Sequence, residues 1–556
     1  MKLFTKAQIK NWDLITQKRQ SVTSLQLMER AAEKAALFLL DNYSGALFQI
    51  VCGRGNNGGD GLAIARFLNQ KGQKIRLYLI QMGSPSKEYS ENLQFLLDSH
   101  FPQITISEPE NFILEPQGVI VDCLVGSGFK NPLPELANTV IQKINQSGLV
   151  IISIDIPSGV SPDLEDQDDF FNIPNQDTNS ISNKIFTDNG NPFVHNYPSY
   201  NGNSTHNNKI LARITLNFEI PKLSSLIPEI GKYYGQWKCL DIFLDEEYEK
   251  NQPSPYFFTT QKDVVSILQP RGKFQYKGDF GHSLLLVGSY GLAGAAYFSS
   301  SAAVSSGSGL VSTLSPEINS AILQTLAPEA MFLPGAGCQI LESIPSINLE
   351  RFTAIGLGPG LGTAASTEKS VISFIKNLKI PLVLDADGIN IISKTKNWKT
   401  WIPAGTILTP HVGEFNRLMG GGSKNPIERL KMGVELAAEI SCVIVLKGAY
   451  SAIILPTGHV HFNSTGNPGM ATGGSGDVLT GILTGLLAQS YSPANAAILG
   501  VYIHGSAGDL AKQVKGEMGL KARDLLGNIG NAFKELEDLK SASLLPASIL
   551  DPKNHY

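Results

Sequence analysis

The sequence has 556 residues, more than a single hydrophobic core usually holds, so at least two domains are expected. Its 45 basic residues nearly balance its 49 acidic residues, which argues against nucleic acid or an anionic membrane as a general partner. Hydrophobic residues make up 42% of the chain, yet no apolar run reaches the roughly 20 residues of a membrane span. The first residues lack the apolar core of a signal peptide, so we expect a cytoplasmic protein.

The cysteines show no disulfide or metal-binding pattern. None of them forms a CxxC pair, and most lie in apolar or strand-like runs. They are Cys52, Cys123, Cys239, Cys338 and Cys442. We expect small core residues in a reducing compartment rather than a disulfide framework or a zinc site.

The first half of the chain alternates strand and helix patterns. Thr5 and Gln8 form a capping-box pattern at the start of a first helix, and residues 24–40 have helical apolar spacing. Apolar runs that predict buried strands lie at 48–53, 75–80, 119–125, 149–157, 210–220 and 237–244. The alternation predicts a Rossmann-like, three-layer α/β/α domain with a parallel sheet.

One segment interrupts this alternation. Residues 161–209 are rich in Asn, Asp, Ser and Gly and have little apolar periodicity, which predicts a long exposed loop. The polar, proline-containing stretch NQPSPY at 251–256 is a candidate linker. We therefore expect one domain over residues 1–250, carrying the insertion, and a second over 251–556.

A glycine-rich loop joins the strand at 48–53 to the next helix. Residues 53–61 read GRGNNGGDG, which differs from the GxGxxG dinucleotide fingerprint. Glycines at such a junction let backbone amides approach a diphosphate, and the helix dipole favours the anion. Asn56 and Asn57 add amide groups, and Asp60 either caps the helix or touches the ligand. The loop predicts a nucleotide site.

Polar side chains also follow two later strands. Asp122 follows the strand residues VIV in the sequence DCLVGSG at 122–128, and Asp155 and Ser158 lie in DIPSG at 155–159. Ligands of open α/β sheets bind at the carboxyl ends of strands, so we expect these groups to converge with the glycine loop. Carboxylate, amide and hydroxyl oxygens without His or Cys suit a hard cation rather than zinc, with potassium and magnesium both open.

The order NNGGDG, D-x-L-x-G-S-G and DIPSG resembles the NAD(P)HX epimerase family over about residues 1–250. The chain departs from the family after DIPSG, where PDLEDQDDF replaces a short Asp-Thr-Gly-type stretch. The resemblance implies that Asn57, Asp122 and Ser158 hold K⁺. It implies substrate contacts from Asn56, Asn57, Gly58, Gly59, Asp60, Gly126, Ser127, Gly128, Phe129, Lys130, Asn131, Pro132 and Asp155.

The second half restarts the strand–loop–helix alternation and predicts a further α/β domain with a largely parallel sheet. Its strands end in glycine-rich or polar segments, which predicts a nucleotide site at one edge of the sheet. These segments are KGDFGHSLLLVGSYGLAGAA at 277–296, AIGLGPGLG at 354–362, LTPHVGEF at 408–415 and LKGAYS at 446–451.

The most informative segment is GNPGMATGGSGD at 466–477, which precedes the helix pattern VLTGILTGLLAQ. Glycine amides and a helix N-terminus together bind anions well. Asp477 lies at this N-terminus, where it either caps the helix or stands beside a bound phosphate. A carboxylate beside an anion hole can take a proton from a hydroxyl while phosphate charge is stabilised.

Residues 257–535 resemble the ribokinase-like fold and, within it, the ADP- or ATP-dependent NAD(P)HX dehydratase family. The carrying motifs are GNPGMATGGSGD, TPHVGEF and DAD at 385–387; a family His is replaced by Tyr276. The resemblance implies Asp477 as the base, and Ala295, Gly360, His411 and Asp477 as contacts of hydrated NAD(P)H. It implies that the adenine nucleotide binds Lys447, Gly448, Ala449, Tyr450, Ser451 and Gly476.

Together the two resemblances imply a nicotinamide-repair enzyme that epimerises R- and S-NAD(P)HX and dehydrates the S form with ADP. They imply NADHX or NADPHX and ADP with Mg²⁺ as small-molecule partners, and a homo-oligomer. One alternative is a ribokinase-like small-metabolite kinase, but such kinases lack an NNGGDG domain. The other is a non-catalytic nucleotide sensor or scaffold, which would leave a mixture of R and S forms only half repaired.

Overall fold

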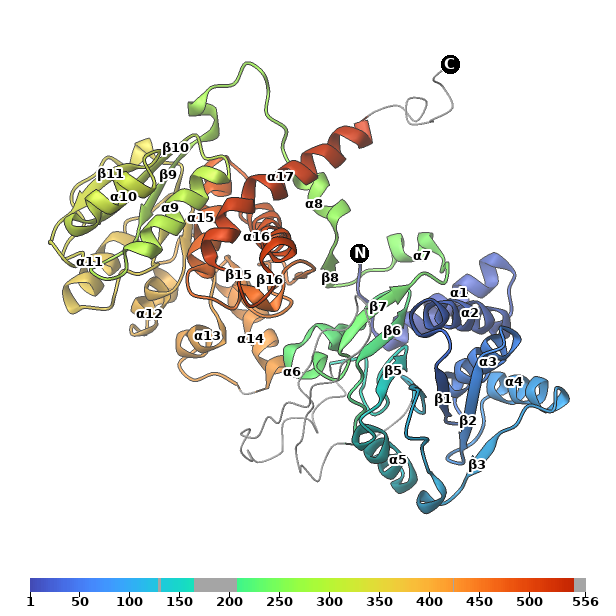
Figure 1. Cartoon of the computed structure of the whole chain (residues 1–556). Helices are drawn as coiled ribbons and strands as arrows, with labels where there is room; N and C mark the ends of the chain where they lie inside the picture. Colours follow the sequence, from blue (N-terminus) through green and yellow to red (C-terminus); the bar gives the residue numbers. More distant parts are fainter. Residues whose placement is uncertain (129–131, 165–207, 424, 545–556) are drawn as a thin grey trace, which may run out of the picture. The chain divides into compact units, whose positions relative to one another are not determined.

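The computed structural model describes residues 1–128, 132–164, 208–423 and 425–544 (Figure 1). Most of the predicted 161–209 loop therefore lies outside the described residues, as do Phe129, Lys130 and Asn131. The chain forms two compact units. One unit is Leu3–Ser254, and the other joins Met1–Lys2 to Pro255–Tyr556.

The first unit is built on a parallel sheet of seven described strands in the order β3-β2-β1-β4-β5-β6-β7. The strands are β1 Leu47–Cys52, β2 Lys74–Ile80, β3 Ile104–Ile106, β4 Val119–Cys123, β5 Val150–Ile154, β6 Ile214–Phe218 and β7 Gln236–Leu240. The helices are α1 Lys6–Gln20, α2 Ser24–Tyr43, α3 Asn56–Gln70, α4 Lys87–Asp98, α5 Glu135–Gln146, α6 Pro228–Gly231 and α7 Glu246–Asn251. The predicted α/β class and parallel sheet are confirmed.

Helices cover both faces of this sheet. On one face α2, α3 and α4 pack against residues such as Ile50 and Val121, and on the other α5 packs against Val51 and Ile120 (Figure 1). Neighbouring residues of one strand thus point into opposite cores, as the two-residue period of a strand requires. This layering leaves the carboxyl edge of the sheet to the loops that follow β1, β4 and β5.

The second unit has a sheet of ten described strands in the order β11-β10-β9-β12-β13-β14-β15-β16-β17-β8. The strands are β8 Tyr256–Thr259, β9 His282–Leu286, β10 Leu310–Pro316, β11 Met331–Gly335, β12 Ala354–Leu357, β13 Leu382–Leu384, β14 Ile407–Leu408, β15 Val443–Leu446, β16 Ala452–Ile454 and β17 Val460–Asn463. Pairing is parallel except between β15 and β16 and between β16 and β17. The largely parallel sheet agrees with the prediction.

Helices lie on both faces of the second sheet as well (Figure 1). They are α8 Gln261–Ile267, α9 Ala293–Ser305, α10 Ser320–Leu326, α11 Ala365–Ile375, α12 Asp387–Ser393, α13 Val412–Leu418, α14 Pro426–Glu439, α15 Ser475–Ala488, α16 Pro493–Lys515 and α17 Ala522–Leu544. The strand residue Ile453 faces the core of α15, α16 and α17, whereas its neighbour Ile454 faces α14 at Gly433.

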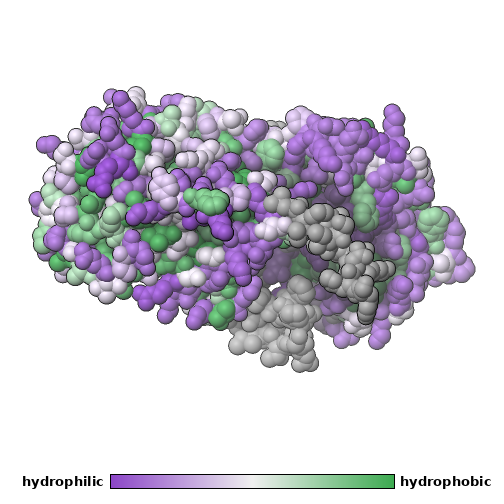
Figure 2. Space-filling view, turned by 90° about the horizontal axis from the view of Figure 1, so that it is seen from above, coloured by the Kyte–Doolittle hydropathy of each residue, from purple (hydrophilic) through white to green (hydrophobic). Residues whose placement is uncertain are grey.

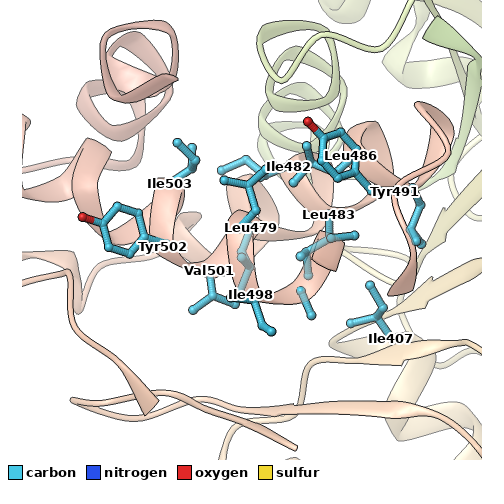
Figure 3. Packing of buried hydrophobic residues seen from close by; sticks show 14 of the residues in the cluster. Ile407, Leu479, Ile482, Leu483, Leu486, Tyr491, Ile498, Val501, Tyr502 and Ile503 are labelled. Carbon is cyan, nitrogen blue, oxygen red and sulfur yellow. The ribbon is translucent and has the colours of Figure 1, made fainter. Parts of the chain in front are cut away.

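Helix α15 is buried on nearly every side. Figure 3 shows Leu479 and Leu483 of this helix in one cluster with Ile498 and Val501 of α16. Each fully buried Leu or Ile side chain of this kind contributes about 1.5–3 kcal/mol of hydrophobic stabilisation. On another side α15 touches α9 so closely that a Cβ at Gly481 would lie 2.2 Å from a carbonyl oxygen of α9. The core therefore fixes the helix whose first turn carries Asp477.

The surface is mixed in character. In Figure 2 hydrophilic residues cover most of the visible face, and hydrophobic residues lie among them in small groups. Phe274, Tyr276 and Met518 are among the exposed hydrophobic side chains. Isolated residues of this kind need no binding partner to explain them. Within the described ranges, every helix is too short or too polar to span a lipid bilayer.

Candidate active sites

The first candidate site begins where β1 passes into α3. A Cβ at Gly58 would lie 1.8 Å from the carbonyl oxygen of Gly53, so the first turn of the helix packs directly on the end of the strand. Only glycine allows this approach. The helix is capped by Gly55 without a side-chain bond. Asp60 lies inside the helix, so the helix-cap interpretation of Asp60 is wrong.

Asn57 is the unusual residue of this turn. Its side chain is buried, and neither its amide oxygen nor its amide nitrogen has a hydrogen-bond partner. A Cβ at Gly126 would lie 2.9 Å from the Cβ of Asn57, so the loop after β4 packs against Asn57. A buried polar group without a partner is costly, so such a group often marks a ligand site.

Asp122 is the centre of a buried hydrogen-bond network. Its Oδ1 accepts from the Ser158 hydroxyl at 2.5 Å, and its Oδ2 accepts from the Ser158 N–H at 2.9 Å and the Ser153 hydroxyl at 2.7 Å. Burial raises the pKa of Asp122, although these bonds oppose the rise. The sequence-predicted residues Asp122 and Ser158 thus meet.

The donor set consists of oxygen atoms, the ligands that hard cations prefer. The Asn57 amide oxygen lacks a partner, and Asp122 and Ser158 supply further oxygens at the same edge of the sheet. Neutral oxygens with one compensated carboxylate suit such an ion better than a metal that needs several charged ligands. Among the described residues, no group of three His, Cys, Asp or Glu side chains is arranged to hold a metal.

Asp155 stands at the carboxyl end of β5 in a left-handed conformation, with φ of 62°. Its Oδ1 lies 2.7 Å from the Nζ of Lys222, whose side chain is only 3% exposed. The same oxygen accepts from the N–H of Phe218 at 3.2 Å. Lys222 was not predicted as a site residue, although its position just after β6 places it at the same edge of the sheet.

Two further carboxylates lie in the electrostatic field of this pair. Burial raises the pKa of Asp13 to about 7, with Lys222 lowering it and Asp155 raising it. Burial also raises the pKa of Asp60 well above its usual value, and Asp155 and Asp13 add to the rise. Asp13 was not predicted as a site residue, because a carboxylate on an amphipathic helix usually faces solvent.

In the second unit, Gly360 and Ala295 come together. Gly360 has φ of 64°, and a Cβ there would lie 2.9 Å from the Cβ of Ala295. Its carbonyl oxygen accepts from the Ser289 hydroxyl at 2.8 Å. The segments that follow β9 and β12 therefore touch with little side-chain bulk.

His411 caps α13. The ring Nδ1 accepts from the backbone N–H groups of Gly413 at 2.9 Å and Glu414 at 3.3 Å. The backbone N–H of His411 donates to the Glu414 carboxylate at 2.8 Å. The ring is 54% exposed. These bonds fix the ring, and its Nε2 lies 3.4 Å from the Oε1 of Glu414.

Asp477 lies in the first turn of α15, whose cap is Gly474 in a left-handed conformation. The interpretation of Asp477 as the cap is therefore wrong, and its carboxylate is available for other contacts. Burial raises the pKa of Asp477 to about 6; Asp385 and Asp387 add to the rise and Lys447 opposes it. Such a value suits a general base near neutral pH.

Lys447 reaches this first turn from the end of β15. Its Nζ lies 2.9 Å from the Oδ1 of Asp385, and the Oδ2 of Asp385 accepts from the Thr480 hydroxyl at 2.8 Å. A Cβ at Gly476 would lie 3.7 Å from both the Lys447 Nζ and the Asp385 Oδ2. The structure thus brings Lys447, Gly476 and Asp477 together. Thr480 was not predicted as a site residue, because a buried helix pattern does not distinguish it from a packing residue.

The rest of the predicted nucleotide loop links β15 to β16. Its turn is closed by Ser451, whose hydroxyl accepts from the N–H of Gly448 at 3.3 Å. The ring of Tyr450 lies 6.3 Å, between centroids, from that of Phe258 on β8. Gly448 and Ala449 are exposed, so their backbone is accessible to a ligand.

The carboxyl edges of the two sheets thus carry the features of two small-molecule sites, one with a buried amide and one with an anion-binding helix start. Comparisons with known proteins agree with this division. Residues 24–173 match the family model described as "YjeF-related protein N-terminus". Residues 283–531 match the model described as "NAD(P)H-hydrate dehydratase".

Relatives of nearly full length carry both parts. The chain is 30% identical to the bifunctional NAD(P)H-hydrate repair enzyme Nnr of Moorella thermoacetica, over 97% of this chain and 98% of that protein. It is 31% identical to the enzyme of the same name from Coxiella burnetii, over 91% and 94%. The chain therefore belongs to the family of bifunctional NAD(P)H-hydrate repair enzymes.

A solved structure is similar to part of the chain. It is the ADP/ATP-dependent NAD(P)H-hydrate dehydratase of Bacillus subtilis, co-crystallised with ATP and Mg²⁺. That protein is 29% identical, and the match covers 50% of this chain and 98% of that one, with a TM-score of 0.44.

Proposed function

We propose that this chain repairs hydrated nicotinamide cofactors with two active sites. The second unit dehydrates S-NAD(P)HX at the expense of ADP, giving NAD(P)H, AMP and phosphate, and the first unit interconverts the R and S forms. Family membership supports the pair of activities. The observation that carries the chemistry is Asp477, a carboxylate with a pKa of about 6 beside the Lys447 ammonium at a helix start.

Dehydration needs help because hydroxide is a poor leaving group near neutral pH. Asp477 would take the proton of the C6 hydroxyl as its oxygen bonds to the terminal phosphorus of ADP, while the bond from that phosphorus to the AMP oxygen breaks. The amides of 473–476 and the dipole of α15 would stabilise the charge on the transferred group. Mg²⁺ would enter with the nucleotide and neutralise phosphate charge.

The phosphorylated hydroxyl is a good leaving group. The lone pair of the ring nitrogen would expel phosphate as the bond from C6 to oxygen breaks. Loss of a proton from C5 then restores the ring double bond of NAD(P)H. Ala295, Gly360 and His411 would hold the hydrated nicotinamide nucleotide, and the 447–451 loop would hold the adenine nucleotide.

For the first unit, we propose that Asn57, Asp122 and Ser158 form a cation site and that its ion is K⁺. The unpartnered amide oxygen of Asn57 supports this assignment. A bound K⁺ would supply positive charge for an oxygen of the substrate. The turn at 56–60, the 126–132 loop and Asp155 would bind and orient NAD(P)HX beside it.

A direct assay tests the proposal. The full chain is incubated with Mg²⁺, ADP or ATP, and chemically hydrated NADH or NADPH, and the absorbance of the reduced nicotinamide is followed. Recovery with ADP and production of AMP are expected, and Asp477→Asn should abolish recovery. Absence of recovery with either nucleotide would refute dehydratase action.

A second assay tests the epimerase half. Pure R-form substrate should be repaired completely by the parent chain, whereas a chain without epimerase activity should repair only the S form. The proposal also assigns residues 1–250 and 251–556 to the two activities, a homo-oligomeric state and a cytoplasmic location. Light scattering on the purified chain measures its molar mass in solution, and the mass of a monomer would contradict the proposed oligomer.

A further inference from the structure

Asp385 is a buried carboxylate without an assigned role. It lies at the carboxyl end of β13, and its side chain is only 2% exposed. Its two oxygens have different partners, the Lys447 ammonium on Oδ1 and the Thr480 hydroxyl on Oδ2. Burying a charge is costly unless it is paired and hydrogen-bonded, and this carboxylate meets both conditions. Its geometry is therefore fixed from both sides.

The ammonium that Asp385 holds stands at the start of α15. A Cβ at Gly476, the residue before Asp477, would lie 3.7 Å from the Lys447 Nζ. The side chain of Lys447 is 24% exposed, and Asp385 is its one hydrogen-bond acceptor among the described residues. An ammonium has three donors, so it retains donors for an anion that binds at the helix start.

The charges around Lys447 keep it cationic. Burial opposes the charged form, but Asp385, Glu414 and Asp477 together raise the pKa of Lys447. The nearest Glu414 oxygen is 3.7 Å away, beyond hydrogen-bonding distance. Lys447 is thus a fixed positive charge beside Gly476, the residue before the group assigned as the base.

We propose that Asp385 and Thr480 hold the Lys447 ammonium against the phosphoryl group that is transferred, so that Lys447 distinguishes ADP from AMP. Asp385 and Thr480 are then positioning residues, and Lys447 is a catalytic residue. The inference rests on the proposed dehydratase function. Its physical basis is that phosphoryl transfer is catalysed mainly by positioning and by stabilising charge on the transferred group.

Thr480 offers a test that leaves every charge in place. Its hydroxyl is buried and donates to Asp385, and it lies one turn after Asp477 on α15. Thr484, one turn later, is also buried, but its hydroxyl donates at 2.7 Å to the backbone oxygen of Thr480. Thr484→Val is therefore a matched control for the packing effect of Thr480→Val.

The first experiment measures nucleotide binding by calorimetry in the presence of Mg²⁺ and without NAD(P)HX. Lys447→Met should weaken the binding of ADP about tenfold or more, the usual effect of losing a hydrogen bond between charged groups. The affinity for AMP should change less than about twofold. Equal weakening of ADP and AMP would overturn the proposal. Because no turnover is needed, this outcome is independent of whether the dehydratase reaction itself occurs.

The second experiment measures kcat and KM for S-NAD(P)HX dehydration. Asp385→Asn should lower kcat about tenfold or more, because an amide cannot hold the ammonium as a carboxylate does. The affinity for AMP should stay that of the parent chain. Thr480→Val should lower kcat in the same direction, with Thr480→Ser and Thr484→Val close to the parent chain. Equal losses from Thr480→Val and Thr484→Val would overturn the positioning role. Binding of AMP with the affinity of the parent chain reports that the second unit, which carries all of these substitutions, is folded.

Discussion

At the scale of single residues, the proposed role of Asp477 as the base predicts how dehydration depends on pH. Its carboxylate must be deprotonated to accept a proton, and burial with Asp385 and Asp387 raises its pKa to about 6. We expect kcat/KM for dehydration to rise with pH through about 6 and to level off above it. A pH series with saturating ADP measures this limb.

Asp385→Asn provides the control for this prediction. Asp385 is the largest source of the rise in the pKa of Asp477 after burial. Its neutralisation should therefore move the acidic limb of the profile to lower pH, even though kcat falls. An acidic limb that stays in place in this variant would show that another group titrates.

The proposed cation site at Asn57 predicts a response of the first unit to potassium. Its buried amide oxygen has no partner, so a cation would remove the cost of leaving it unsatisfied. We expect replacement of K⁺ by tetramethylammonium to slow R-to-S conversion about tenfold or more, and Asn57→Ala to abolish the response to K⁺. Dehydration of pure S-form substrate in the same buffers is the control, and equal slowing of both reactions would contradict the assignment.

At the scale of helices and strands, the sequence predicts most of the elements whose patterns lie within one short segment of the chain. Thr5 and Gln8 form the expected capping box, and the long apolar runs become central strands. The short strands β3 and β11 were not predicted, because they have few buried residues and gain stability from pairing with distant segments. Tyr256, assigned to a linker, begins β8, which pairs with β17 some 200 residues later.

The candidate sites show the same division. Glycine loops and strand ends are local signals, and they correctly indicated that Asp122 meets Ser158 and that Lys447 meets Gly476. The residues that bind to these site residues and fix their positions lie in other parts of the chain. Lys222 has no motif of its own, since a single lysine after a strand is usually solvated. Its role depends on the distance to Asp155, which only the fold sets.

The Lys222–Asp155 pair joins the end of β5 to the segment after β6. Lys222 is almost completely buried, and removal of one member of a buried pair leaves the other uncompensated. We expect Lys222→Met to destabilise the first unit by about 2–3 kcal/mol, below the fully buried case because Asp155 is partly exposed. R-to-S conversion should fall with it, as measured by urea unfolding and by repair of R-form substrate.

Arg19 supplies a matched control for this change. It pairs at 2.7 Å with Asp245 and with Glu247 in the same unit, but its side chain is 43% exposed. Exposed pairs contribute about 0–1 kcal/mol, so Arg19→Met should have a small effect on stability and on epimerisation. Equal destabilisation by the two substitutions would show that burial of the Lys222 pair is unimportant.

At the scale of the whole molecule, the two units have separate sheets and separate cores. Unit Leu3–Ser254 contains Asn57 and Asp155, whereas Asp477 and Lys447 lie in the unit that begins again at Pro255. Each site is built from residues of its own unit. A change that inactivates one site through its own side chains should therefore leave the chemistry of the other intact.

This independence predicts complementation in trans. Asn57→Ala chains, in which we expect slowed epimerisation, and Asp477→Asn chains, in which we expect no dehydration, should together repair a mixture of R and S forms completely. The rate should equal that of the parent chain at the same concentration of each site, because the S form diffuses from one molecule to another. The measurement is the full time course of nicotinamide absorbance, with each variant alone as control. A mixture that remains slower than the parent chain at every protein concentration would mean that the substrate passes directly between the two sites of one chain, since diffusion between molecules becomes faster as concentration rises and direct transfer does not.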